Sequence, residues 1–124
     1  SPGVRDGNSF TEWGMFRWLK MLSEVVGALV PFLKWCKHPL VEDAAVRPYN
    51  FKEIRIAAAS AMPKILNSAT EVVEYSDPQD YDQNMQYVET LSNMVIGALE
   101  EASDLEPDED VRFDILYALN DCVQ

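Results

Sequence analysis

Two rows of polar side chains have the spacing of helix faces and could hold a charged ligand. Asp114, Tyr117 and Asp121 are three and four residues apart, so they share one face of a helix. A second row with similar spacing consists of Ser60, Lys64, Asn67 and Glu71. We interpret the two rows as candidates for a protein-binding surface, and the acidic row suits a basic partner better.

A denser acidic group lies in the segment SDLEPDED, residues 103–110. Its candidate partner-binding side chains are Asp104, Glu106, Asp108 and Glu109. These acids could contact a lysine-rich peptide or the basic face of a GTPase. The alternative is a solvated face, in which acids at a helix start favour the helix dipole and Asp108 or Asp110 caps the helix.

Catalytic and metal-binding patterns are weak in this sequence. His38 is the single histidine, and no serine or cysteine is arranged with it as a triad. The two cysteines, Cys36 and Cys122, lack the companions of a zinc site, and no phosphate loop or calcium loop occurs. We therefore expect neither an enzyme nor a bound metal or cofactor.

The net charge of −11 argues against direct binding of nucleic acid, which requires clustered Lys and Arg. The charge is divided unevenly along the chain. Residues 1–62 carry eight basic and six acidic side chains, whereas residues 63–124 carry two and fifteen. The second half therefore favours basic partners.

The length of 124 residues suits one small domain. Only five glycines occur, which favours helices over an all-β fold. We expect no membrane span, because no apolar run is long enough, and we expect no secretory signal. The small number of cysteines favours a reducing compartment. The sequence lacks an initial Met and ends in mid-pattern, so we expect a piece of a longer protein.

Hydrophobic periodicity predicts four helices after a flexible lead-in at 1–9. The first helix covers 10–37, the second 50–74 and the fourth 110–123. The third can be capped by Asp82 or Asn84 and runs through 103. Asn50 and Glu53 have the spacing of a capping pair for the second helix. Among the apolar side chains placed on inward faces are Val25, Val72, Tyr87, Met94 and Leu116.

An internal repeat relates the second and fourth helices at an offset of 57 residues. The run Glu53-Ile54-Arg55-Ile56 lies over Asp110-Val111-Arg112-Phe113, and Ala61-Met62 lies over Ala118-Leu119. Repetition of a helix pair at tens of residues is typical of α-solenoids, in which each unit buries its apolar face against its neighbours.

The repeated pattern resembles the HEAT repeat, in which an apolar helix precedes an acidic linker and an alanine-rich second helix. Within HEAT proteins, IRIAAASAMP (54–63) and EPDEDV (106–111) resemble the importin-β (karyopherin-β) superfamily, most of all its importin-five or karyopherin-β-three branch. The resemblance implies an all-α solenoid of two antiparallel hairpins, 10–74 and 75–124, in a right-handed stack. It also implies that Arg55, Arg112 and Asp110 form a structural ladder between repeats.

The same resemblance implies a segment of a nuclear import receptor that shuttles between cytoplasm and nucleus through the pore. Such receptors bind cargo with basic localisation signals on the inner helices and release it in the nucleus when the GTP-bound GTPase Ran binds. They also contact nucleoporin repeats through apolar pockets between outer helices. Candidate aromatic side chains for such a patch, or else for the core, are Trp13, Phe16, Trp18 and Trp35.

Two alternatives remain open at this point. One is a HEAT scaffold of a phosphatase regulatory subunit or a translation factor. The other is an unrelated four-helix bundle that binds a metal or a small ligand.

Overall fold

The computed structural model describes residues 6–35 and 51–123, with α1 side chains described from residue 14 onward. These residues form four helices and no strand: α1 (Asp6–Leu33), α2 (Lys52–Glu74), α3 (Tyr81–Leu105) and α4 (Glu109–Val123). The described chain is therefore all-α, as the periodicity predicts. No helix in these ranges has the length and apolar character needed to cross a membrane.

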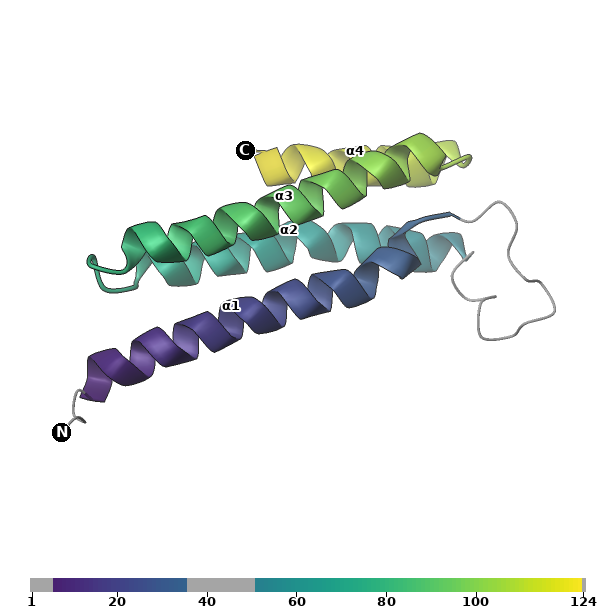
Figure 1. Ribbon diagram of the computed structural model, residues 1–124. Helices are drawn as coiled ribbons and strands as arrows, with labels where there is room; N and C mark the ends of the chain where they lie inside the picture. Colours follow the sequence, from purple (N-terminus) through teal and green to yellow (C-terminus); the bar gives the residue numbers. More distant parts are fainter. Residues whose placement is uncertain (1–5, 36–50, 124) are drawn as a thin grey trace.

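Successive helices run antiparallel and form two hairpins that lie side by side (Figure 1). The first helices of the hairpins, α1 and α3, are in contact, and so are the second helices, α2 and α4. α2 also contacts α3, whereas the described residues of α1 and α4 do not meet. The arrangement thus has α2 and α3 in its middle, and among the described helices none covers the outer side of α1 or of α4.

The core fills the space between the two hairpins with apolar side chains from every helix. Val26, Leu33, Met62, Leu99 and Ile115 are fully buried. Each such side chain stabilises the fold by about 1.5 to 3 kcal/mol relative to an exposed position. Small residues complete this packing on α2, where the AAASA run places Ala58 and Ala59 in the core and lets neighbouring helices approach closely.

The first helix differs from its predicted bounds at both ends. α1 begins at Asp6, inside the segment 1–9 that was expected to be a flexible lead-in. Gly7 lowers helix propensity by about 1 kcal/mol, which a long helix tolerates. α1 also ends at Leu33 and not at residue 37, soon after Pro31, whose ring lacks the N–H for an intrahelical hydrogen bond. The predicted connector at 38–49 lies outside the described residues.

Helix caps follow the predictions only in part. Phe51 precedes α2 without a side-chain cap, and the predicted cap Asn50 lies outside the described residues. α3 starts one turn earlier than the predicted caps imply, with Asp80 before it and no side-chain cap hydrogen bond. Only the cap of α4 is made by a predicted side chain, Asp108.

Five side chains that the periodicity places inward are exposed. Val25, Val72 and Leu116 expose 39%, 37% and 46% of their surface, and Tyr87 and Met94 expose 36% and 37%. They lie at the edges of apolar stripes that are wider than the contact with the neighbouring helices. In α1 the buried face instead includes Met15 and Leu19.

Candidate functional site

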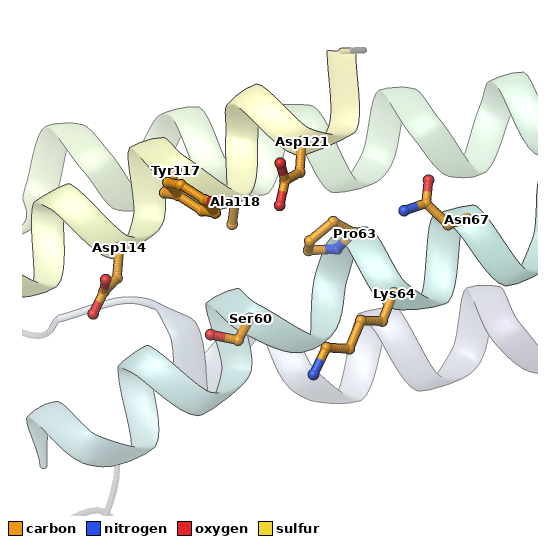
Figure 2. A pocket seen from close by; sticks show the side chains of 8 residues that line it. All are labelled: Ser60, Pro63, Lys64, Asn67, Asp114, Tyr117, Ala118 and Asp121. Carbon is orange, nitrogen blue, oxygen red and sulfur yellow. The ribbon is translucent and has the colours of Figure 1, made fainter.

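A groove of about 290 Å³ runs between α2 and α4. Its lining side chains are Ser60, Pro63, Lys64, Asn67, Asp114, Tyr117, Ala118 and Asp121 (Figure 2). Six of the seven residues in the two predicted rows are among them. The rows are more than forty residues apart in sequence, and the packing of α4 on α2 brings them together.

The packing of α4 fixes which of its side chains border the groove. Val111, Ile115 and Ala118 are buried, and they set the rotation of the helix. The acidic row is offset from this stripe toward α2, so Asp114 and Asp121 stand on the edge of the groove (Figure 2). Ala118 forms the base of the groove on this side.

On the α2 side, the groove has a rigid base and a polar edge. Pro63 is buried within the helix and lines the groove beside exposed Ser60 and Asn67. Glu71, the last member of the predicted α2 row, is exposed but lies outside the lining.

The groove carries more negative than positive charge. The lining contains two carboxylates, those of Asp114 and Asp121, and one ammonium group, that of Lys64. In the described part of the chain no ion pair joins Lys64 to either carboxylate, and its side chain extends along α2 in Figure 2. Tyr117, 61% exposed, lies between the two carboxylates along α4 (Figure 2). An aromatic ring flanked by carboxylates suits a lysine or arginine side chain.

Glu106 corrects the prediction made for the acidic loop. It was expected to face a partner, but only 2% of its surface is exposed. Its carboxylate accepts two hydrogen bonds from the Arg55 guanidinium, at 2.7 Å from Nε and 2.9 Å from Nη2. Glu106 and not Asp110 therefore pairs with Arg55, and the pair ties the first turn of α2 to the α3–α4 turn.

The sequence contains a clue to this role that acidity alone conceals. Glu106 precedes Pro107, and a residue before proline is restricted to extended backbone. Glu106 indeed has φ −77° and ψ 118° and ends α3. The Glu-Pro pair thus stops the helix and holds the carboxylate toward α2, whereas Glu109 and Asp110 are exposed.

Arg112, the repeat equivalent of Arg55, contacts the same turn differently. Its Nη2 and Nε donate to the backbone carbonyl of Glu106, at 2.7 and 3.3 Å. One glutamate thus receives both repeat arginines, one on its carboxylate and one on its carbonyl. The contacts assign Arg55 and Arg112 to the joining of helices within this chain.

Asp108 acts as the cap of α4. Its Oδ1 accepts hydrogen bonds from the backbone N–H groups of Asp110 and Val111, at 2.9 and 3.2 Å. These bonds, first that from Val111, lower the pKa of the Asp108 carboxyl. The other acids of the segment, Asp104, Glu109 and Asp110, are exposed around the ends of α3 and α4.

A second, more apolar groove lies between α1 and α3 and has a volume of about 210 Å³. The rings of Phe16 and Tyr87 meet edge to face there, with centroids 5.4 Å apart. Of the predicted aromatic patch, only Phe16 lines this groove. Trp18 and Trp35 are half-buried, and the side chain of Trp13 lies outside the described residues.

The described residues contain no group of three His, Cys, Asp or Glu side chains that could hold a metal ion. His38 and Cys36 lie outside them. Cys122 is a free thiol, and burial, with a smaller effect of the Asp121 carboxylate, raises its pKa to about 11. Compared with known proteins, the chain matches no family model, no curated protein and no solved structure.

Proposed function

We propose that the chain is a protein-interaction scaffold, a segment of a nuclear import receptor that binds basic cargo signals in the α2–α4 groove. The observation that carries the proposal is the groove itself. Asp114 and Asp121 flank Tyr117 on one edge, and Ser60 and Asn67 offer hydrogen bonds on the other. An extended basic segment can place a side chain on the ring while its backbone meets the polar groups of α2.

The helix order supports the solenoid form of this proposal. In a stack of HEAT-like hairpins, first helices adjoin first helices and second helices adjoin second helices, as α1 with α3 and α2 with α4 do here. The Arg55–Glu106 pair links one hairpin to the next. With this arrangement, the groove belongs to the layer of second helices, which is the cargo-binding layer of such receptors.

Regulation by Ran and passage through the pore complete the proposal. Release of cargo when Ran binds requires that the GTPase and the basic segment compete for the receptor. The α1–α3 groove, with Phe16 and Tyr87, is the candidate contact for the phenylalanine side chains of nucleoporin repeats. It lies in the layer of first helices, away from the acidic groove.

Titration of the protein with a fluorescent lysine-rich peptide tests the groove. We expect the variant Asp114→Asn/Asp121→Asn to weaken binding at least about tenfold, because both charged acceptors are lost. We also expect the affinity of the unchanged chain to fall steeply as salt rises, because the attraction is electrostatic.

Glu89→Gln/Glu100→Gln is the matched control, since it removes the same charge from exposed positions on α3. It should bind the peptide nearly as well as the unchanged chain. Equal losses in the two double variants would show that net charge alone attracts the peptide, and the groove would then have no specific role.

A further inference from the structure

The groove between α1 and α3 has a charge opposite to that of the chain around it. One ammonium group, that of Lys20, lines this groove, and none of its described lining residues is acidic. The whole chain, by contrast, has a net charge of −11, and the α2–α4 groove has two carboxylates for one ammonium group. The two grooves therefore suit ligands of opposite charge.

The α1–α3 groove lies between the two hairpins and not on the outer side of an end helix. Its walls come from both first helices, with Phe16 and Leu19 on α1 and Tyr87 and Leu91 on α3. Leu19 and Leu91 are buried, at 4% and 3% exposure, so they form its base. Helices that covered the outer sides of α1 and α4 would extend the layers without replacing either wall.

The size and lining of the groove suit one aromatic side chain. Its volume of about 210 Å³ is below the value of about 300 Å³ at which pockets for drug-sized ligands begin, so it has room for a single large side chain. The rings of Phe16 and Tyr87 meet edge to face, and a third ring can pack on them in the same way. Met94 lines the same groove, and a methionine sulfur makes favourable contacts with aromatic rings.

The edge of the groove offers a positive charge and a hydrogen-bond donor. Lys20 is exposed, and in the part of the chain that the structure describes it forms no ion pair. Ser23 lies three residues further along the same helix face, and its hydroxyl group can donate. The acids nearest in sequence to the lining, Glu24 and Glu89, do not line the groove. A carboxylate at this edge therefore meets an ammonium group and a hydroxyl group.

From these observations we propose that the α1–α3 groove binds an acidic aromatic segment of a partner protein. A phenylalanine or tyrosine ring of the segment fills the groove, and an aspartate or glutamate beside the ring contacts Lys20. The inference rests on the part of the proposed function that assigns this groove to phenylalanine side chains, and it adds a carboxylate as a second recognition element. Because residues 63–124 are strongly negative, we expect one or two acids beside the ring and not a long acidic run.

An NMR titration of the ¹⁵N-labelled chain with three capped heptapeptides at low salt tests the proposal. The peptides have Asp-Phe-Asp, Asn-Phe-Asn or Asp-Ala-Asp at their centre and otherwise consist of glycine and serine. We expect the backbone signals of Lys20, Ser23 and Thr90 to shift saturably with the first two peptides, with Kd values of about 0.1 to 1 mM. The Asp-Phe-Asp peptide should bind about twofold to fivefold more tightly than the Asn-Phe-Asn peptide, which is the range of an exposed charge pair. The Asp-Ala-Asp peptide should cause no saturable shift.

Two single variants identify the cation that reads the carboxylate. Lys20→Gln should bind the two phenylalanine peptides equally, because the charge at the groove edge is lost. Lys52→Gln is the matched control, since it removes the same charge from an exposed position at the start of α2, and it should keep the preference. The ¹⁵N spectra of both variants should otherwise match that of the unchanged chain.

The outcomes separate this inference from the proposed function. Equal affinities of the two phenylalanine peptides for the unchanged chain would overturn the inference and leave the proposed phenylalanine contact standing. A preference for Asp-Phe-Asp that survives in Lys20→Gln would also overturn it, because another group would then read the carboxylate. If none of the peptides shifts the signals of the groove, the phenylalanine contact itself is wrong and the inference fails with it.

Discussion

Replacement of Glu106 by alanine should destabilise the protein more than any other change of an acidic residue in the 103–110 segment. The substitution removes two charge-assisted hydrogen bonds to Arg55 and the bond that Glu106 Oε2 accepts from the Asp108 N–H at 3.1 Å. The side chain of Arg55 is only 4% exposed, so the remaining guanidinium would be buried without its carboxylate.

Loss of one partner from a buried ion pair costs about 3 to 5 kcal/mol. For a chain of this length, that cost corresponds to a fall of about 10 to 20 °C in the melting temperature. Urea and thermal unfolding, followed by helical circular dichroism, measure both quantities. The control is Asp104→Ala, which removes an exposed acid of the same segment and should change stability little.

The double variant Arg55→Met/Glu106→Met separates the pair from its surroundings. Replacing a whole buried pair by apolar side chains is often neutral or stabilising, so the double variant should regain most of the lost stability. A Glu106→Ala protein within about 0.5 kcal/mol of the unchanged chain would refute this reasoning. So would a double variant that is less stable than Glu106→Ala.

Three further expectations concern local features. Asp108→Ala should lower the melting temperature at pH 7, whereas Asp108→Asn should retain the cap. The folded-state pKa of Asp108 lies below its ordinary value of 3.8, so the stability that its charge contributes is present above about pH 4 and is lost as pH falls through the folded pKa. The Asn variant should show no such loss. Gly97→Ala should stabilise α3 by up to about 1 kcal/mol in urea unfolding, because a Cβ there meets no atom within 4 Å. In a Cys36→Ser background, iodoacetamide should label Cys122 slowly at pH 8 and faster toward pH 11, and rapid labelling at pH 8 would contradict its raised pKa.

Sequence periodicity predicted the helices because their apolar positions repeat every three to four residues over long stretches. The same reasoning placed Asp114, Tyr117 and Asp121 on one helix face, and the structure sets that face beside Ser60 and Asn67. The two rows lie side by side because each occupies one helix face and because the two helices pack together. Both the polar rows and the apolar packing residues repeat at helical spacing in the sequence.

The burial of a single charged residue produces no periodic pattern in the sequence. Glu106 stands in a run of acids, and only its backbone conformation before Pro107 and the reach of Arg55 distinguish it from its neighbours. The exposure of Val25 and Leu116 could not be predicted from the sequence either, because periodicity identifies an apolar face but not how much of that face a neighbouring helix covers. Tertiary contacts decide both cases.

The most direct test of the groove as a site for basic segments is an NMR titration of the ¹⁵N-labelled chain with the lysine-rich peptide. We expect the backbone signals of Ser60, Asn67, Asp114, Tyr117 and Asp121 to shift together and saturably, while those around Phe16 and Tyr87 stay in place. Shifts confined to the α1–α3 groove, or small shifts spread evenly over all acidic residues, would contradict the proposed function.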